Sequence, residues 1–454
     1  MSRAESDEFI AGVAALSVGY DGREAPEGWT WKKLTALARL ESGHTPSRKH
    51  PEYWGGDVPW VSIPDARVHH GGVIHATDEN VTEEGLANSA ARWLPKDTIC
   101  LSRTASVGYV TRLGRPMATS QDFVNWVCGP ALDPGYLMYA LMAEGSHIRE
   151  FGKGSTHTTI YFPEVLALHL ALPPLAEQRR IVTKVEAVLG EVSAAKERLA
   201  KVPAILKRFR QAVLAAACCG KLTEEWRSAN GGTPVDGDVP PGWTATRLEP
   251  MLRDARYGTS AKCSYESRGG VPVLRIPNIA RGELDLDDMK FAPDTSEDWA
   301  RVCVEPGDIL VCRTNGSLDL IGKAAVVPVL PTLTSFASYL IRLRSDEGTL
   351  LPRYLHCFLT SPSGREQLTR HAKTSAGQFN INLEILRGLE ILLPPLNEQA
   401  EILRRVTELF QVADTIDRSA NAARARVNSL PQAILGQAFR GELTPVFAWV
   451  DPRS

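Results

Sequence analysis

Apolar residues at heptad spacing run through two long stretches of this 454-residue chain. From Ile181 they recur at alternating steps of four and three as far as Ala216, and the same spacing returns 221 residues later, from Ile402 to Ile434. A stripe this narrow suits the seam between two helices better than a helix buried on all sides. The pattern predicts two long helices that pair within the chain as an antiparallel coiled coil. The alternative is that each helix packs against its own neighbouring domain.

The same sequence signals begin both stretches. Leu-Pro-Pro-Leu-Ala-Glu-Gln at 172–178 returns as Leu-Pro-Pro-Leu-Asn-Glu-Gln at 393–399. Paired prolines are typical of a sharp helix start. Pro203 and Pro431 fall inside the predicted helices, where a missing backbone N–H is expected to kink or interrupt them.

The repeat extends over the whole of each half, because Gly-Trp-Thr at 28–30 returns at 242–244. Each half is therefore expected to be one mixed α/β domain followed by one long helix. The predicted class is α+β, with an internal two-fold pseudo-repeat and a Gly-, Pro-, Asp- and Ser-rich linker between the halves. The predicted parts are an N-terminal segment 1–25, a first domain 26–172, a first helical region 173–223, a linker 224–241, a second domain 242–393, a second helical region 394–445 and a tail 446–454.

Each domain is expected to mix strands and helices in the same order. A turn and a buried strand end in an Arg-Thr pair, at Arg103 in the first domain and at Arg313 in the second. Helical segments follow at 135–151 and 352–371, and then a polar loop and an apolar strand lead into the Pro-Pro corner. An apolar patch at 9–16 predicts a short helix near the N-terminus.

Charge and cysteine content bear on the expected partners and the expected cellular compartment of the chain. A net charge of −2 gives no global basic surface, so any nucleic-acid surface must be local. The eight cysteines show no Cys-x-x-Cys spacing, which favours reduced thiols in apolar surroundings. No apolar run approaches the length of a membrane span, and no secretory signal pattern is found at the N-terminus. A cytoplasmic protein with no membrane partner is therefore expected.

Motifs for catalysis are incomplete in this sequence. Residues 316–323 resemble a phosphate-binding loop, but they have one residue too many between the glycines. Residues 152–157 lack the last glycine of a dinucleotide-binding turn. His69, His70 and His75 lie near one another without a cysteine or carboxylate motif at ligand spacing. The sequence therefore predicts no catalytic residue and no metal site.

Five motifs together resemble the specificity subunits of type I restriction-modification systems. They are the doubled Pro-Pro corner, Gly-His-Thr-Pro-Ser at 43–47, Glu-Tyr-Trp-Gly-Gly at 52–56, Val-Pro-Trp at 58–60 and Ser-Arg-Thr at 102–104. The resemblance covers nearly the whole chain from about residue 26. It departs from the family pattern in the second half, where Gly-Thr-Ser-Ala-Lys at 258–262 replaces the Gly-x-Thr-Pro-Ser form.

The resemblance implies two target-recognition domains, joined by two antiparallel helices, that read a bipartite asymmetric site on double-stranded DNA. It implies a non-catalytic subunit whose partners are two modification subunits, which methylate adenine, and restriction subunits, which translocate and cut DNA. S-adenosylmethionine, ATP and Mg²⁺ are then expected on those partners, and no cofactor is expected on this chain. The complex as a whole would serve in defence against foreign DNA.

Polar loops are the expected DNA-contacting regions, because base edges are read by hydrogen-bonding side chains and phosphates by cations and hydroxyls. The candidates in the first domain are Ser47, Arg48, Lys49, Arg67, His69, Arg103, Thr104, Lys153, Ser155, Thr156 and His157. The candidates in the second domain are Lys262, Arg275, Asn278, Arg313, Thr314, Lys373, Thr374, Ser375 and Gln378. A structural ion pair is the alternative for the two strand-end arginines.

Helix length predicts a gap between two half-sites. The thirty-six residues from Ile181 to Ala216 would span about 54 Å at ~1.5 Å per residue, which is roughly sixteen base pairs of B-DNA. Two other functions are open at this point. A scaffold holding two protein-binding domains without DNA is favoured by the near-neutral charge, and a self-contained nuclease or methyltransferase is disfavoured by the missing motifs.

Overall fold

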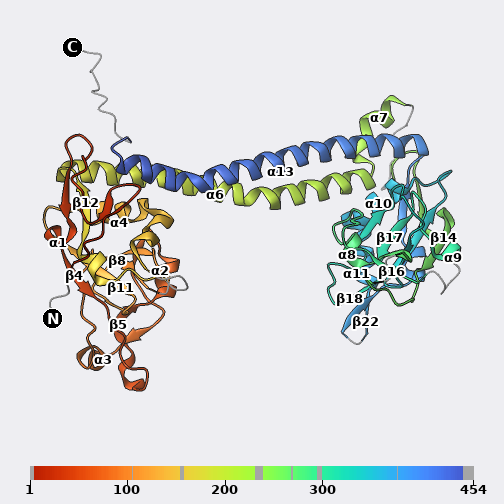
Figure 1. Cartoon of the computed structure of the whole chain (residues 1–454). Coiled ribbons are helices and arrows are strands. Elements are labelled where there is room, and N and C mark those ends of the chain that lie inside the picture. Colours follow the sequence, from red (N-terminus) through yellow and green to blue (C-terminus); the bar gives the residue numbers. More distant parts are fainter. Residues whose placement is uncertain are drawn as a thin grey trace, which may run out of the picture. The chain divides into compact units, whose positions relative to one another are not determined.

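The computed structural model describes residues 5–104, 106–153, 158–230, 239–266, 269–293, 299–375 and 377–442. The chain divides into two compact units, Met1–Ala200 with Ala422–Ser454 and Lys201–Asn421. Each unit contains one mixed α/β domain and part of two long helices, α6 (Leu175–Cys218) and α13 (Leu396–Phe439) (Figure 1). The predicted mixed α and β class with two long helices is confirmed.

Both long helices begin at the residue that follows the proline pair, Leu175 in α6 and Leu396 in α13. Pro203 and Pro431 lie inside continuous helices, so the expected interruption is wrong. A proline removes one backbone hydrogen bond, and the remaining bonds of a 44-residue helix carry the chain past it. Among the described residues, no helix combines the length and the apolar character that crossing a bilayer would require.

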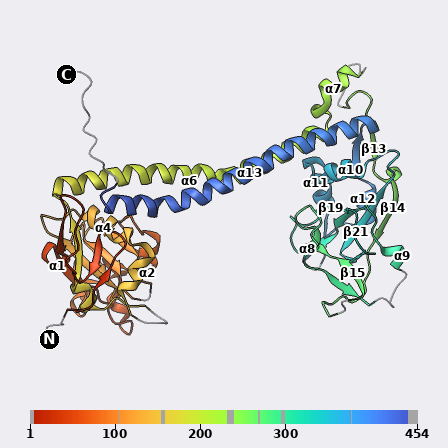
Figure 2. The same cartoon turned by 45° about the horizontal axis from the view of Figure 1, so that its top comes forward.

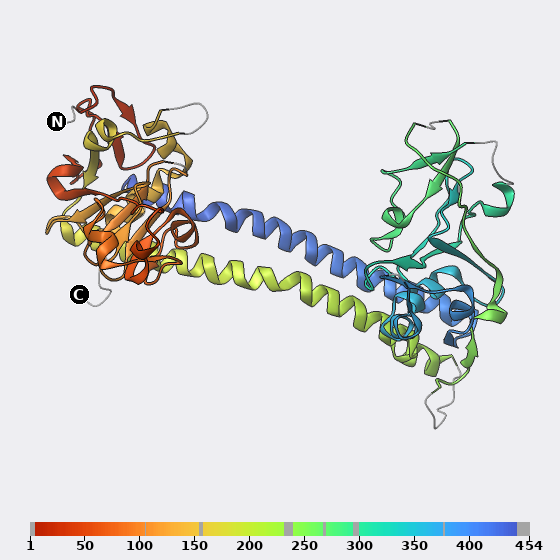
Figure 3. The same cartoon turned by 90° about the horizontal axis from the view of Figure 1, so that it is seen from below.

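Within each unit the two helix segments lie side by side, as Figure 2 and Figure 3 show. In the second unit Arg210 of α6 pairs with Asp414 of α13 at 2.6 Å. Arg405, nearer the start of α13, donates at 3.0 Å to the carbonyl of Leu222, just beyond the end of α6. The contact later in the sequence around α6 is made with the earlier residue of α13, so the two helix segments of this unit are antiparallel.

The strands of the first unit are β1 (Ile10–Ala11), β2 (Leu16–Val18), β3 (Thr30–Lys33), β4 (Ala38–Ser42), β5 (Trp54–Val61), β6 (Val73–Ile74), β7 (Asn80–Val81), β8 (Ile99–Ser102), β9 (Val110–Leu113), β10 (Ala118–Thr119), β11 (Phe123–Cys128) and β12 (Leu168–Leu172). Its shorter helices are α1 (Leu34–Leu37), α2 (Ile63–Val68), α3 (Glu83–Ala87), α4 (Pro134–Ala143) and α5 (Phe162–Leu166), with 3-10 turns η1 (Pro51–Tyr53) and η2 (Gly145–Phe151). The sheets have the orders β1-β2-β12-β3, β4-β11-β8-β9-β6 and β10-β5-β7.

The N-terminal segment contributes strands rather than the expected helix. β1 and β2 pair with each other, and β2 also pairs with β12, so the helix predicted at 9–16 is wrong. The chain turns between the two strands because the Glu144 carboxylate accepts hydrogen bonds from the N–H groups of Val13, Ala14 and Leu16 at 2.6, 3.2 and 3.1 Å. In a helix over 9–16 these N–H groups would bond carbonyls four residues earlier, so the carboxylate takes the donors that the helix needs.

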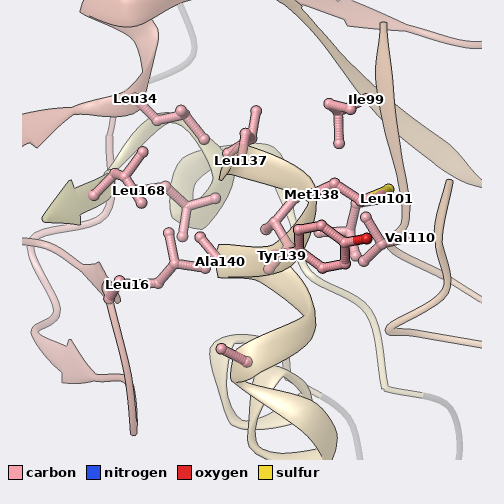
Figure 4. Packing of buried hydrophobic residues seen from close by; sticks show 14 of the residues in the cluster. Leu16, Leu34, Ile99, Leu101, Val110, Leu137, Met138, Tyr139, Ala140 and Leu168 are labelled. Atoms are coloured by element: carbon pink, nitrogen blue, oxygen red, sulfur yellow. The ribbon is translucent and has the colours of Figure 1, made fainter. Parts of the chain in front are cut away.

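The core of the first unit surrounds α4 (Figure 4). Leu137 of this helix is fully buried and belongs to one cluster with Ile99 and Leu168. Ile181 of α6 and Phe439 of α13 join the same cluster. Since each such side chain stabilises the fold by about 1.5–3 kcal/mol when buried, one end of each long helix is fixed to this domain.

The strands of the second unit are β13 (Thr244–Arg247), β14 (Leu252–Tyr257), β15 (Val271–Leu274), β16 (Lys290–Ala292), β17 (Ile309–Cys312), β18 (Thr314–Asn315), β19 (Ala324–Val326), β20 (Ser335–Phe336), β21 (Leu340–Ser345), β22 (Lys373–Ser375), β23 (Gln378–Asn380) and β24 (Glu390–Leu393). Its shorter helices are α7 (Glu224–Ala229), α8 (Ile276–Ile279), α9 (Trp299–Val302), α10 (Pro352–Thr360), α11 (Pro362–His371) and α12 (Leu383–Arg387), with turns η3 (Lys221–Thr223) and η4 (Glu249–Met251). The sheets are β13-β24, β14-β21-β17-β19, β16-β15-β20 and β18-β23-β22. The helical segments predicted in both domains are confirmed as α4 with η2 and α10 with α11.

The segment predicted as a linker begins with the helix α7. Arg227 on this helix is 8% exposed, and it pairs at 2.8 Å with Glu398 in the first turn of α13. The same carboxylate accepts a hydrogen bond from the Thr223 hydroxyl at 2.7 Å. The first part of the predicted linker is therefore a short helix held by one buried ion pair, and its residues Glu224, Glu225, Ser228 and Ala229 are exposed. Residues 231–238 of the predicted linker and the predicted tail 446–454 lie outside the described residues.

The two Pro-Pro corners are built in the same way. Gln178 and Gln399 are both 0% exposed. The side-chain oxygen of Gln178 accepts from the Asp133 N–H at 2.9 Å, and that of Gln399 accepts from the Leu351 N–H at 2.8 Å. Each amide nitrogen donates to two backbone carbonyls, one of them inside the corner. The corner thus ties the last strand of each domain and the loop before its helical segment to the start of a long helix.

Candidate nucleic-acid interface

A strand-end arginine occupies the same backbone position in each domain. Arg103 follows β8, and its N–H donates to the carbonyl of Asp122 at 2.8 Å, while its own carbonyl accepts from the Ile160 N–H at 2.9 Å. Arg313 follows β17, where its N–H donates to the Tyr339 carbonyl at 3.0 Å and its carbonyl accepts from the N–H of residue 381 at 2.9 Å. The loop before the last strand therefore meets the Arg-Thr pair in both domains.

Both guanidinium groups stack on an aromatic ring. The Cζ atom of Arg103 lies 4.8 Å from the ring centroid of Phe162, and that of Arg313 lies 4.5 Å from the ring centroid of Tyr257. Each also donates to a backbone carbonyl, Arg103 to Gln121 at 3.5 Å and Arg313 to residue 338 at 3.4 Å. A ring beneath a guanidinium restricts its motion, so both arginines are held at the ends of their strands.

In the first domain, Thr104 and Lys153 both contact Thr159. Lys153 and Thr159 pair as an antiparallel bridge, and the Thr159 hydroxyl donates to the Thr104 hydroxyl at 3.3 Å. Lys153 forms ion pairs with Glu8 at 2.9 Å and Glu164 at 3.5 Å, and the hydrogen bond to Glu8 raises the pKa of its ammonium group. The predicted contacts Ser155, Thr156 and His157 lie outside the described residues.

The second domain brings its candidates to a small sheet. β18 starts with Thr314 and pairs with β23, which starts with Gln378. β22, which contains the predicted contacts Lys373, Thr374 and Ser375, pairs with the other side of β23. The structure therefore places five of the predicted DNA-contacting residues on three adjacent strands, although they are about sixty residues apart in the sequence.

The loop with Ser47, Arg48 and Lys49 is exposed and leads into β5. The guanidinium of Arg48 lies 3.5 Å from the ring centroid of Trp54 and binds both carboxylate oxygens of Glu79 at 2.7 Å. That contact lowers the pKa of the Glu79 carboxyl. Sequence reasoning missed Glu79, because nothing in a pattern links residues 31 positions apart.

Replacing Glu79 with Gln is expected to free the charge of Arg48 for a phosphate. Stability should change by less than about 1 kcal/mol, because the pair is exposed. One added phosphate contact should make the slope of log K against log salt for duplex DNA steeper by about 0.9. Fluorescence anisotropy at several salt concentrations measures the slope, with Glu27→Gln, an exposed carboxylate of the same unit, as the matched control. An unchanged slope would remove Arg48 from the interface.

These loops join the strand-end site in both domains. The N–H of His44 donates to the carbonyl of Thr119 at 2.9 Å, which places the 43–47 loop beside the segment that Arg103 contacts. In the second domain Thr259 exchanges backbone hydrogen bonds of 2.8 Å with residues 336 and 338, and Arg313 binds the carbonyl of 338. The exposed Lys262 lies on the same loop. In each domain, three separate loops thus meet around the strand-end arginine.

Three other candidates lie beside this region or within the fold. Arg67 is exposed in the last turn of α2, and His69 caps that helix and is half-buried. Arg275 forms an ion pair with Asp288 at 2.9 Å. Arg67 and Lys262 are exposed, whereas the guanidinium of Arg275 is largely buried and held by Asp288.

Asn278 is a correction to the predicted contacts. It is 1% exposed, its side-chain oxygen accepts from the N–H of Arg275 at 2.8 Å, and its amide nitrogen donates to the carbonyl of Asp285 at 2.8 Å. Asp65 holds the equivalent turn of the first domain, where its carboxylate accepts from the N–H of Ser62 at 2.9 Å. Ser-Ile-Pro-Asp at 62–65 is a helix-capping pattern. Because residues 275–278 repeat this turn in the second domain, the sequence did contain a signal for the structural role of Asn278.

Chemistry beyond binding has little support in the described residues. No group of three His, Cys, Asp or Glu side chains among them is arranged to hold a metal ion. All eight cysteines are free, and burial raises the pKa of Cys218 to about 12 and that of Cys357 to about 11, which keeps these thiols unreactive. A polar cleft of about 630 Å³ in the second unit is lined by two arginines and two glutamates, among them Arg247 and Glu384.

Comparison with known proteins identifies the family. Residues 26–204 match the type I restriction modification DNA specificity domain. The chain is 32% identical over 428 residues to the EcoKI specificity subunit of Escherichia coli strain K12, covering 92% of this chain and 90% of that protein. It is also 32% identical over 426 residues to the StySPI specificity subunit of Salmonella potsdam, with the same coverage of 92% and 90%. The chain belongs to the specificity subunits of type I restriction enzymes.

Solved structures show the same fold. The HsdS subunit from Thermoanaerobacter tengcongensis superposes with a TM-score of 0.61 at 20% identity, covering 93% of this chain and 99% of that one. A chain from a structure on complex assembly and conformational transition of the type I restriction-modification system gives a TM-score of 0.64 at 21% identity, covering 93% and 100%. As a member of this family, the chain is a DNA sequence-recognition subunit that works with methyltransferase and restriction subunits. The scaffold function without DNA is not favoured.

Proposed function

We propose that each domain reads one half of a bipartite, asymmetric site on double-stranded DNA, and that the strand-end region is the reading surface. The observation that carries this proposal is the repeated junction of Arg103 with Thr104 and of Arg313 with Thr314. The same backbone contacts hold both junctions, and different side chains surround them. Two reading surfaces on one repeated scaffold, each with its own polar groups, are what a split and asymmetric target requires.

The long helices set the gap between the half-sites in this proposal. α6 and α13 pair along their heptad seams as an antiparallel coiled coil, and the repeat of the corner at Gln178 and Gln399 supports a two-fold pseudo-repeat. Such a repeat offers two similar surfaces, so two modification subunits bind one chain. The chain itself is non-catalytic and binds no cofactor, while S-adenosylmethionine, ATP and Mg²⁺ act on the partner subunits. A genomic DNA target implies work in the cytoplasm.

Single arginine variants test the assignment of half-sites. Arg313→Ala should weaken binding by about 1–3 kcal/mol through the second half-site alone, and Arg103→Ala should do so through the first, because each arginine serves one surface. The measurement is selection from a random duplex library by the full chain with its modification subunit. The binding affinity is then measured for duplexes in which each base pair of the selected site is changed in turn. If both variants bind the same DNA sequence as the wild type with the same affinity, the strand-end region is not the reading surface. A wild-type complex that selects no sequence would contradict DNA reading itself.

A further inference from the structure

One face of the small three-stranded sheet collects hydrogen-bonding residues. β23 pairs antiparallel with both neighbours, so that its Asn380 lies opposite Thr314 of β18 and its Gln378 lies opposite Ser375 of β22. Residues directly opposite one another, and residues two apart on a strand, share a face. Thr314, Gln378 and Asn380 therefore share one face, with Lys373 and Ser375 at the matching register positions of β22. Figure 1 shows β18 and β22 on the side of the second unit away from α13.

The Thr314 hydroxyl holds the amide of Gln378 in place. It donates to Gln378 Oε1 at 3.2 Å, and the pair lies at the surface. The contact restricts the position of the side chain on the sheet, so less ordering is needed when a base binds. The amide presents a donor and an acceptor side by side.

A donor and an acceptor side by side suit adenine. In the major groove adenine presents N7 as an acceptor and its N6 amino group as a donor, which one glutamine amide satisfies with two hydrogen bonds, whereas guanine presents two acceptors. The groove is also wide enough to admit a β-ribbon. We propose, on the basis of the DNA-reading function above, that Gln378 reads an adenine of the second half-site and that Thr314 is its positioning residue.

The first domain presents different groups at the equivalent place. Thr159, which lies 221 residues before Asn380, donates to the Thr104 hydroxyl at 3.3 Å. A hydroxyl both donates and accepts, whereas an amide offers a donor and an acceptor side by side. At these two positions the first domain therefore carries two hydroxyls, and the second carries the hydroxyl of Thr314 and the amide of Asn380. The residue 221 positions before Gln378 is His157, which lies outside the described residues.

Library selection by the full chain with its modification subunit tests the proposal. The wild type should fix adenine at one base pair of the second half-site. Gln378→Glu replaces the donor with an acceptor, so the preferred base there should become cytosine, whose amino group donates, with adenine disfavoured by about 5- to 150-fold. Thr314→Val keeps the shape without the hydroxyl and should lower adenine-over-guanine discrimination, and Thr314→Ser should restore it.

The matched control is Thr244→Val, an exposed threonine of β13 in the same unit, which should select the wild-type site. Unchanged preferences at every base pair in Gln378→Glu and Thr314→Val, with DNA still bound, would overturn the inference and leave the proposed function standing. Loss of the whole second half-site in Thr314→Val, without rescue by Thr314→Ser, would also overturn it, because that result marks a structural role. A wild type that selects no sequence would instead remove the proposed function.

Discussion

Replacing Arg227 with methionine is expected to lower the free energy of unfolding of the second unit by about 3–5 kcal/mol, the cost of breaking a buried ion pair from one side. Glu398 is 2% exposed, and both Nε and Nη2 of Arg227 donate to its carboxylate, at 3.0 and 2.8 Å. Without them, the Thr223 hydroxyl at 2.7 Å is the side-chain donor left to this carboxylate in the part of the chain that the structure describes. Urea titration followed by hydrogen exchange in peptides of residues 201–421 measures the loss unit by unit.

The double variant Arg227→Met with Glu398→Leu separates the ion pair from the shape of the site. It removes both charges, so most of the lost stability should return, as it does when apolar residues replace a buried pair. Peptides of the first unit should keep their exchange rates in both variants, because neither residue belongs to that unit. Equal stability of the single and double variants would show that α7 is held by packing alone.

Much of the fold follows from the periodicity of apolar residues and from the prolines at which the helices begin. The heptad spacing and the proline pairs predict α6 and α13 to within a few residues of their starts, because these signals are local. The conformations at 9–16 and at 224–229 have another cause. There the conformation depends on single distant groups, the carboxylates of Glu144 and Glu398, which lie more than a hundred residues away. The residues near 9–16 and 224–229 in the sequence give no indication of such distant partners.

The candidate site shows the same division. The Arg-Thr pairs at the strand ends are predictable, since a turn, an apolar run and a polar pair are read directly from the sequence. Which side chains reach the surface is a matter of tertiary contacts. Asn278 is buried in a turn, whereas Arg48 is exposed and held by Glu79. The Thr314–Gln378 contact joins positions 64 residues apart and required the strand register.

Replacing Gln399 with leucine is expected to lower the free energy of unfolding of the second unit by roughly 3 kcal/mol, taking about 1 kcal/mol for each backbone group left without a partner. Those groups are the Leu351 N–H, bound at 2.8 Å, and the carbonyls of Thr349 and Pro394, each bound at 2.9 Å. Leucine has a similar volume, so the loss reports hydrogen bonds rather than a cavity. Chemical denaturation with hydrogen exchange measures it, and Gln411→Leu, at an exposed position of α13, should change stability by no more than about 0.5 kcal/mol.

Gln178→Leu extends the same argument to the first unit. Its amide binds the Asp133 N–H at 2.9 Å and the carbonyls of Ala131 and Pro173 at 3.0 and 2.9 Å, so a loss of similar size should appear in the peptides of that unit instead. Since both glutamines join a domain to the start of a long helix, each variant should also loosen the recognition of one half-site. Should the two variants destabilise the same unit, the corners would not be independent, and a repeat of two like halves would lose its structural basis.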